Sequence, residues 1–296
     1  MKRITQTLTG GRVLISDGAW GTFLIRKGLR PGECPELWNV EHREAVLEIA
    51  RSYVEAGSDA ISTNSFGGSA FKLAHYGLSD RVHELNRAAA AISREAAGPN
   101  RFVMGSIGPT GKILMMGDVT EEELYEAFKG QSLALADGGA DACLIETMTA
   151  LDEATIAIRA AKENTPLEVI CTFTYDRQMG GRYHTMMGVA PASMAEAALA
   201  AGADIIGVNC SLGPGEMPPI VRELRQAAPN TPILVQPNAG HPVVKNGLDT
   251  YSETPETFAR FVPELMASGA GFLGACCGSG PDHIRAIAAA TAGRRA

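Results

Sequence analysis

Three cysteines of this chain stand where their sulfur atoms could hold one metal ion. Cys276 and Cys277 are adjacent and follow a short apolar run, and Cys210 ends another apolar run just before a Gly/Pro turn. Neighbouring cysteines seldom form a disulfide with each other, because the ring is strained. Both can face one ion where the backbone turns sharply, and Gly278 permits such a turn. Thiolates suit a soft divalent metal such as zinc, and three protein ligands with one open position are typical of a catalytic zinc.

Two alternatives remain open for these three cysteines. They could be small buried residues, since cysteine is common in protein interiors. They could also hold a purely structural zinc, but such sites normally have four protein ligands, often as CxxC pairs, and no CxxC occurs in this sequence. We interpret the other cysteines as inert, because two lie inside apolar runs and one in a loop: Cys143, Cys171 and Cys34.

Two carboxylates, Asp17 and Glu146, also end apolar runs. Together they could hold an ammonium group or act as acid and base. For Asp17 the alternative is a helix N-cap or a turn, whereas Glu is rarely buried without a partner. The stretch 105–111 faintly resembles a phosphate-binding loop, but Ser106 and Ile113 break the pattern, so we interpret it as a tight turn near a ligand.

These residues need a scaffold that brings distant strand ends together. The chain repeats a unit in which an Ala-rich helical stretch, a small-residue turn and an apolar run follow one another, which predicts βαβ units with a buried parallel sheet. We expect strands at Val13–Asp17, Ala60–Phe66, Phe102–Gly108, Ala142–Thr147, Glu168–Thr174, Ile205–Cys210, Ile233–Asn238 and Phe272–Cys276. We expect helices at Glu41–Ala56, Ser79–Ala96, Thr120–Ala136, Leu151–Lys162, Pro191–Ala201, Gly215–Ala227, Pro255–Met266 and Pro281–Thr291.

Eight strand–helix units at a spacing of roughly 35 residues predict an α/β fold of the (β/α)8 TIM-barrel type, with residues 1–296 as a single domain. A doubly wound open sheet is the alternative, but no dinucleotide fingerprint follows the first strand. Active residues of such barrels lie at the C-terminal ends of the strands, and the sixth and eighth strands flank the seventh. The three cysteines should therefore converge at the mouth of the barrel.

Composition and charge exclude several kinds of partner. Apolar residues make up 45% and charged residues 20% of the chain, and the net charge is −7 without a Lys/Arg cluster. We therefore expect neither nucleic acid nor an anionic membrane as a partner. The sequence shows no signal peptide and no apolar run of spanning length, which predicts a cytoplasmic protein. The oligomeric state stays open, and a homo-oligomer is compatible with this composition.

Seven segments, taken in order, carry a family resemblance: Asp17–Thr22, Thr63–Phe66, Gly105–Gly111, Ile145–Thr147, Gly207–Ser211, Gln236–Gly240 and Gly274–Gly278. Together they resemble the homocysteine-binding domain of the homocysteine S-methyltransferases. That family includes betaine–homocysteine methyltransferase, S-methylmethionine-type enzymes and the N-terminal module of cobalamin-dependent methionine synthase. The match runs from about residue 11 to 288, and Asn-Cys-Ser paired with a later Cys-Cys-Gly is highly specific.

The resemblance implies that Cys210, Cys276 and Cys277 bind one Zn²⁺ per chain, with the homocysteine sulfur as fourth ligand. It implies transfer of a methyl group to the homocysteine thiolate to form methionine. Its implied substrate-binding residues include two carboxylates for the amino group and backbone for the carboxylate: Asp17, Glu146, Gly18, Ala19 and Asn209. The sequence departs from the family at Ala275 and at 279–280, where small residues replace small ones and we expect little consequence.

The resemblance leaves the methyl donor open. Betaine or another small onium donor would favour an aromatic wall, for which the candidates are Trp20, Trp38, Tyr76 and Tyr183. The alternative is a stand-alone homocysteine and zinc module that takes its methyl group from a separate corrinoid protein carrying methylcobalamin. We expect the protein to lack the folate, cobalamin and activation modules of a full methionine synthase and the long C-terminal extension of animal betaine enzymes. An alternative of another class is a metal-free TIM-barrel lyase that uses the same two carboxylates as acid and base.

Overall fold

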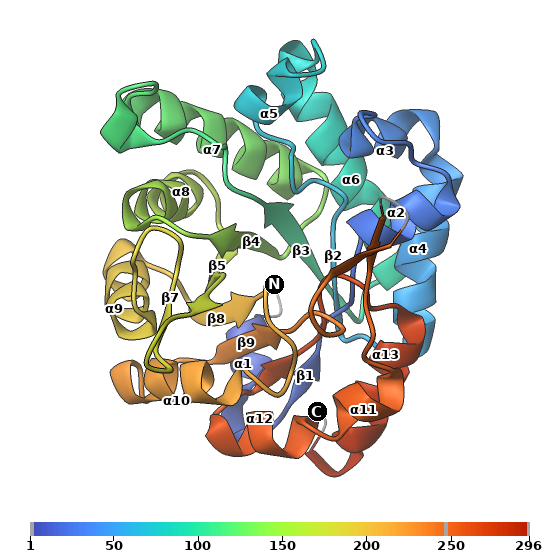
Figure 1. The fold of residues 1–296 in the computed structure, drawn as a ribbon. Coiled ribbons are helices and arrows are strands. Elements are labelled where there is room, and N and C mark those ends of the chain that lie inside the picture. The colour runs from blue at the N-terminus through green and yellow to red at the C-terminus, as the bar shows by residue number, and fades with distance from the viewer. Residues whose placement is uncertain (1–2, 246–247, 295–296) are drawn as a thin grey trace.

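The computed structural model describes residues 3–245 and 248–294 and shows a barrel of parallel strands inside a ring of helices (Figure 1). The eight strands are hydrogen-bonded in the order β1-β12-β9-β8-β5-β4-β3-β2. From β2 to β12, each barrel strand pairs with the next barrel strand along the chain, and β12 pairs with β1. This order confirms the predicted (β/α)8 barrel and argues against a doubly wound sheet. The strands are β1 (Leu14–Ile15), β2 (Ala60–Ser62), β3 (Phe102–Ile107), β4 (Ala142–Met148), β5 (Glu168–Phe173), β8 (Ile205–Asn209), β9 (Ile233–Gln236) and β12 (Phe272–Leu273).

The seam between β1 and β2 is closed by single hydrogen bonds, since no strand ladder joins these two strands within the described ranges. The backbone N–H of Asp59 donates to the carbonyl of Ile15 at 2.7 Å. Further along, the Asp17 carboxylate accepts from the backbone N–H of Ser62, also at 2.7 Å. Near the C-terminal ends of β1 and β2, a carboxylate thus accepts the hydrogen bond that a strand carbonyl would accept in a regular sheet. Asp17, a predicted site residue, therefore also helps to close the barrel.

The outer helices occupy most of the predicted stretches, and two of them begin with common N-terminal signals. Thr120 and Glu123 form the capping box of α7, and Pro281 is the first residue of α13. The helices are α4 (Arg43–Ala56), α6 (Val82–Ala97), α7 (Glu121–Asp137), α8 (Leu151–Asn164), α9 (Pro191–Ala201), α10 (Pro218–Ala227), α11 (Pro255–Ala259), α12 (Val262–Ser268) and α13 (Pro281–Ala290).

One predicted helix, Pro255–Met266, is wrong as a single element. The structure divides it into α11 and α12, which are separated at Arg260 and Phe261. Pro263 is the second residue of α12 and has no N–H to donate to the fourth residue before it. Its ring would also collide with that carbonyl, so the chain has to begin a new helix at this point.

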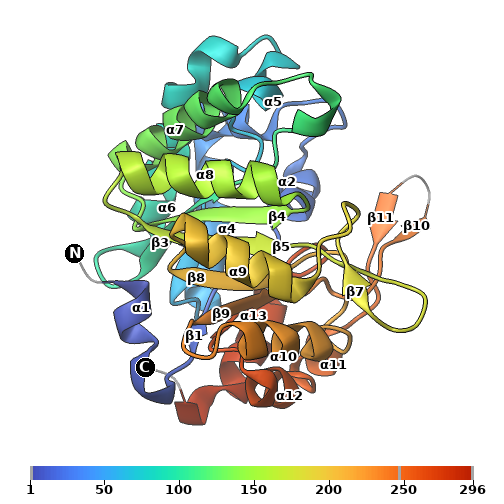
Figure 2. The same cartoon turned by 90° about the vertical axis from the view of Figure 1, so that its left-hand side faces the viewer.

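Short elements at the two ends of the barrel were not predicted. They are α1 (Ile4–Thr7), α2 (Gly21–Lys27), α3 (Trp38–Glu41), α5 (Ala70–Ala74), the hairpin β6 (Asp176–Arg177) with β7 (Tyr183–His184), and the hairpin β10 (Val243–Lys245) with β11 (Leu248–Thr250). Figure 2 shows α1 at one end of the barrel and the two hairpins at the opposite end. No helix in the described part of the chain has the length and apolar character needed to cross a bilayer.

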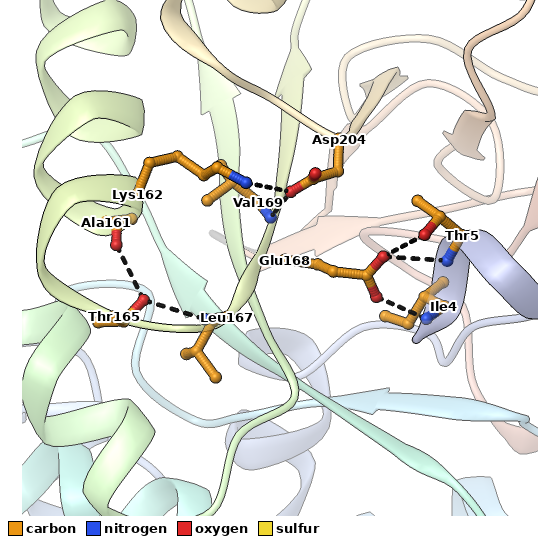
Figure 3. A network of polar contacts seen from close by, with 9 residues as sticks. All are labelled: Ile4, Thr5, Ala161, Lys162, Thr165, Leu167, Glu168, Val169 and Asp204. Carbon is orange, nitrogen blue, oxygen red and sulfur yellow. Dashed lines mark hydrogen bonds and ion pairs between the residues drawn. The ribbon is translucent and has the colours of Figure 1, made fainter. Parts of the chain in front are cut away.

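Helix α1 closes the end of the barrel at which the strands begin. The Ile4 side chain is fully buried in the cluster that fills the barrel interior, against residues such as Leu14, Phe102 and Phe272. Figure 3 shows how Glu168, the first residue of β5, holds this helix. Its carboxylate accepts from the N–H of Ile4 at 2.5 Å, and from the N–H of Thr5 at 3.1 Å and its hydroxyl at 2.5 Å. A carboxylate at a helix N-terminus satisfies N–H groups that the helix itself leaves unpaired.

We expect Glu168→Ala to lower the free energy of unfolding by about 2–3 kcal/mol, because it leaves the buried N–H of Ile4 without an acceptor. Urea unfolding followed by circular dichroism measures the change. Glu126→Ala is the matched control, since Glu126 is an exposed carboxylate that pairs with Lys129 on the same helix. Equal stability of the two variants would contradict a holding role for Glu168.

Candidate active site

The three predicted cysteines converge at the C-terminal end of the barrel. Cys210 follows β8, and Cys276 and Cys277 follow β12, with β9 between these strands. The Sγ of Cys277 lies 3.9 Å from the Sγ of Cys210 and 4.0 Å from the Sγ of Cys276. All three sulfurs lie within 4.8 Å of one another, so the predicted meeting of the sixth and eighth strands is confirmed.

The backbone at the C-terminal end of β9 holds both cysteine segments. The N–H of Cys210 donates to the carbonyl of Gln236 at 3.0 Å, and the N–H of Cys276 donates to the carbonyl of Pro237 at 2.7 Å. Cys210 and Ser211 have φ angles of 63° and 56°, in the left-handed region that side chains other than glycine seldom adopt. Such strain persists only where the surroundings impose it, and it is common at functional sites.

The geometry of the sulfur atoms fits one tetrahedral metal ion. A Zn–S bond of about 2.3 Å with tetrahedral angles places two sulfur ligands about 3.8 Å apart. The distances of 3.9 and 4.0 Å are close to this value and far from a disulfide bond, and all three cysteines are free. Each of the three residues is only partly buried, so a fourth ligand could reach the ion from the cavity.

The ionisation of the three thiols also favours a cation. The pKa of Cys210 is lowered because the neighbouring thiols of Cys276 and Cys277 donate to its sulfur. The pKa values of Cys276 and Cys277 are raised. The largest cause is that same hydrogen bond with Cys210, and burial and the negative charge of Cys210 act in the same direction. One thiolate is therefore stable by itself, whereas three thiolates need a positive charge among them.

Glu146 faces the cavity above the barrel, near the end of β4. Its carboxylate accepts from the Ser106 hydroxyl on one oxygen and from the Asn209 side-chain amide, at 3.4 Å, on the other. Burial is the main cause that raises the pKa of Glu146 to about 7; the charges of Asp17 and Cys210 act in the same direction, and the Ser106 hydrogen bond opposes them. A bound ammonium group would reverse this shift, because an adjacent cation favours the ionised carboxylate.

Asp17 is fully buried and already has three donors. One oxygen accepts from the Trp20 indole N–H at 2.8 Å and from the N–H of Ser62 at 2.7 Å, and the other from the Ser62 hydroxyl at 3.0 Å. Burial nevertheless raises the pKa of Asp17 to about 6. Asp17 does not line the cavity, so its role toward an amino group remains a prediction, and its visible contacts hold Trp20 and β2.

Asn209 lies beneath the cavity and supports its wall. Its side-chain oxygen accepts from the N–H of Thr147 at 2.9 Å and from the Thr172 hydroxyl at 2.7 Å. Its amide donates to the Thr147 hydroxyl at 2.8 Å and to Glu146. Thr147 has a φ of 61°, and these bonds hold it there. A direct contact between Asn209 and a substrate remains a prediction.

The backbone predicted to hold a substrate carboxylate, at Gly18 and Ala19, does line the cavity. In this structure the N–H of Ala19 donates to the Ser279 hydroxyl at 3.1 Å, and that hydroxyl donates to the carbonyl of Cys276 at 2.6 Å. A Cβ at position 18 would lie 2.7 Å from the same hydroxyl, so a larger residue there would have to displace it. Ser279, one of the departures from the family pattern, thus connects the predicted carboxylate site to a cysteine.

The cavity has a volume of about 400 Å³ and opens at the mouth of the barrel. Its lining combines the three cysteines, Glu146 and the backbone of Gly18 and Ala19 with aromatic and apolar side chains. Its lining residues are Gly18, Ala19, Trp20, Gly21, Leu24, Pro35, Glu36, Ser62, Thr63, Asn64, Ser65, Phe66, Ser106, Glu146, Thr147, Cys210, Gln236, Ala275, Cys276 and Cys277.

Of the aromatic residues considered for a donor wall, Trp20 lines this cavity, whereas Trp38, Tyr76 and Tyr183 do not. Phe66, which the sequence did not single out, lines it and is 42% exposed. The sequence also did not identify Ser106 as a site residue, although its hydroxyl donates to the Glu146 carboxylate. A serine at a strand end is too common to be informative, and only the fold shows that its hydroxyl meets a carboxylate.

Comparisons with known proteins identify a family and related sequences for this chain. The sequence profile described as Homocysteine S-methyltransferase matches residues 14–291. The chain is 34% identical to the methionine synthase of Mycobacterium tuberculosis over 298 residues and 35% identical to that of Mycobacterium leprae over 306 residues. Each alignment covers 95% of this chain but only 25% and 24% of those proteins, so the chain spans about a quarter of their length.

Among solved structures, the metallated form of the homocysteine methyltransferase MmuM from Escherichia coli has the same fold, with a TM-score of 0.76. Its sequence is 22% identical, and the superposition covers 94% of this chain and 96% of that one. The family profile, in contrast, spans nearly the whole barrel and contains both cysteine segments. The match sets aside the lyase alternative: this chain belongs to the homocysteine S-methyltransferase family.

Proposed function

We propose that this chain binds one zinc ion through Cys210, Cys276 and Cys277 and transfers a methyl group to the sulfur of homocysteine, which forms methionine. The observation that carries the proposal is the sulfur geometry, with contacts of 3.9 and 4.0 Å at the edge of a cavity large enough for an amino acid. A catalytic zinc needs three such ligands and one accessible position. Membership of the family and the fold shared with a metallated methyltransferase support the same conclusion.

Zinc would keep the substrate thiol ionised near neutral pH, where a free thiol with a pKa of about 8.5 is mostly protonated. The chain itself would bind and orient the amino acid. Glu146 presents a carboxylate to the cavity and is suited to the substrate ammonium group. The N–H of Ala19 is suited to the carboxylate, which would have to share or replace the present contact with Ser279.

The methyl transfer requires a sulfur nucleophile in line with an electrophilic methyl group. A bond forms between the homocysteine sulfur and the methyl carbon while the bond between that carbon and the donor breaks. An onium donor then leaves as a neutral amine or sulfide with the electron pair of the broken bond. The walls of the cavity supply orientation and exclude water from this step.

We infer a small onium compound, such as betaine, as the donor. Trp20 and Phe66 line the cavity, and aromatic faces attract sulfonium and quaternary ammonium groups. The second candidate is a methyl group delivered by a separate corrinoid protein. It is supported by the two relatives named methionine synthase, which are 34% and 35% identical to this chain.

The test is turnover of the purified, zinc-loaded chain with homocysteine and each donor in parallel. Betaine, a dimethylsulfonium compound, S-methylmethionine and free methylcobalamin are offered, and methionine is measured by mass spectrometry. We expect one zinc per chain and methionine from one small onium donor. Methionine from methylcobalamin alone would favour the corrinoid alternative, and a chain without stoichiometric zinc would overturn the proposal.

A further inference from the structure

Glu36 is a second carboxylate in the lining of the cavity, and it has no part in the contacts proposed for homocysteine. It belongs to the 3-10 turn Pro35–Leu37, and only 3% of it is exposed. One oxygen accepts from the N–H of Gly67 at 2.7 Å, and the other accepts from the Cys34 thiol at 3.4 Å. Among the described residues, no Lys, Arg or His nitrogen lies within 4.0 Å of the carboxylate, and Lys72 acts on it from farther away. Burying a carboxylate without a cation is costly, so a cation in the cavity would be attracted to it.

Two aromatic residues line the cavity together with Glu36. Phe66 directly precedes Gly67, whose N–H donates to the Glu36 carboxylate. The Phe66 ring lies so close to Gly108 that a Cβ there would be 2.6 Å from a ring carbon. Trp20 has its indole N–H fixed by a hydrogen bond of 2.8 Å to a buried carboxylate. Aromatic faces attract organic cations, and Glu36 adds a full negative charge, so the cavity holds the components of a site for an organic cation.

Hydrogen bonds fix the segment that carries Glu36 to the loop after β2. The side-chain amide of Asn64 donates to the carbonyl of Pro35 at 2.7 Å and to the side-chain oxygen of Asn39 at 3.0 Å. The side-chain amide of Asn39 donates in turn to the carbonyl of Asn64 at 2.8 Å. Both asparagines are buried, which protects these bonds from water. The Glu36 carboxylate is therefore held in place before a ligand binds, and this lowers the entropic cost of binding.

Glu36 and the first of the three cysteines lie on opposite sides of the barrel mouth. Cys210 follows β8, whereas Glu36 is bound to the loop after β2. In the closed strand order β8 is four places from β2 in either direction, and Figure 1 shows these strands across the barrel from each other. In-line transfer requires the attacking sulfur and the leaving group to lie on opposite sides of the methyl carbon. A homocysteine sulfur held at the cysteines would therefore leave the side of Glu36 to the methyl donor.

We propose that Glu36 is a specificity-determining residue for the methyl donor: its carboxylate, with Trp20 and Phe66, holds the positive charge of a quaternary ammonium or sulfonium group. The inference rests on the proposed function, because it takes this cation to be the donor. During transfer the bond between the methyl carbon and the nitrogen or sulfur of the donor breaks. The electron pair of that bond stays on the donor atom, and the donor group becomes neutral. The attraction to Glu36 is therefore strongest for the bound donor and decreases toward the transition state, so it lowers KM and does not raise kcat.

The test compares an organic cation with its uncharged isostere, each added to the full, zinc-loaded chain with homocysteine present. Choline and 3,3-dimethyl-1-butanol have the same shape, because a tert-butyl group replaces the trimethylammonium group. Proton NMR titration of their methyl signals at pH 8 gives both Kd values. We expect the wild type to prefer choline, and Glu36→Gln to raise the Kd of choline about tenfold or more without weakening the binding of the isostere. Glutamine keeps an acceptor for the N–H of Gly67, so this substitution removes the charge alone.

Glu41→Gln is the matched control, because Glu41 is exposed at the end of α3 and does not line the cavity. Its choline Kd should equal that of the wild type. With an onium donor that yields methionine, Glu36→Gln should raise the KM of the donor and leave kcat, zinc content and the Kd of homocysteine near their wild-type values.

The inference would be overturned by equal choline affinity in Glu36→Gln and the wild type, or by a wild type without a preference for choline. A parallel loss of choline and of its isostere in Glu36→Gln would also overturn it, since that result indicates an altered cavity and not a lost charge. A wild type that binds no zinc but binds choline through Glu36 would overturn the proposed function and leave the cation site in place, so the two failures are distinguishable.

Discussion

Cys210→Ser is expected to leave the chain folded but without stoichiometric zinc and without measurable methionine formation. Serine keeps the size of the side chain, but its hydroxyl does not ionise near neutral pH, so the site loses one of three thiolates. Activation by a metal contributes several kcal/mol, and each 1.4 kcal/mol is a tenfold change in rate. We therefore expect a loss of about 10³-fold or more in kcat/KM. Zinc content by atomic absorption and methionine by mass spectrometry measure the two effects.

The matched control for this prediction is Cys143→Ala. Cys143 is fully buried in β4, among the residues packed between the sheet and the helices. Burial raises the pKa of its thiol to about 12, which suits a small inert core residue. We expect one zinc per chain and near wild-type turnover, with a modest loss of stability. If Cys210→Ser retained both zinc and activity, the cysteine group would not be the metal site.

The barrel could be predicted from the sequence because its signal is repeated and local. Each strand is an apolar run between glycine-containing turns, and the closed sheet buries such runs on both faces. The parts that were missed depend on distant contacts. Helix α1 has only four residues and is held by Glu168, which is 164 residues from Ile4. No pattern within the first residues of the chain predicts that contact.

The candidate site was predictable to the extent that it depends on residue type at strand ends. Cysteines 210, 276 and 277 could be found in this way, because soft ligands at the ends of strands flanking one common strand must converge. The hydroxyl that supports Glu146 could not. Ser106 is an ordinary residue type near the end of a strand, and its meaning comes from the carboxylate that the fold places beside it. Asp17 shows the converse, since its visible contacts also close the barrel seam.

The metal-free, substrate-free chain should become more stable above neutral pH when Glu146 is replaced by glutamine. Burial raises the pKa of Glu146 from its ordinary value of 4.5 to about 7, so the folded chain binds this proton more tightly than the unfolded chain does. The stability from this proton is fully present below pH 4.5 and is lost as the pH rises through 7, where the buried charge has to form. Glu146→Gln avoids that charge and should gain about 2–3 kcal/mol at pH 8 and nothing at pH 4.

The same substitution should weaken homocysteine binding, because a neutral amide cannot replace the carboxylate opposite an ammonium group. Losing one partner of a desolvated charge pair costs about 2–5 kcal/mol, so we expect Kd at pH 8 to rise about 30-fold or more while zinc content stays unchanged. Calorimetric titration of the zinc-loaded chain measures Kd, and urea unfolding of the metal-free chain measures stability. Glu196→Gln, on the exposed face of α9, should change neither quantity. A gain in stability with unaltered binding would show that Glu146 is a strained carboxylate that does not bind the substrate. A carboxylate that binds the substrate cation should give a gain in stability together with weaker binding.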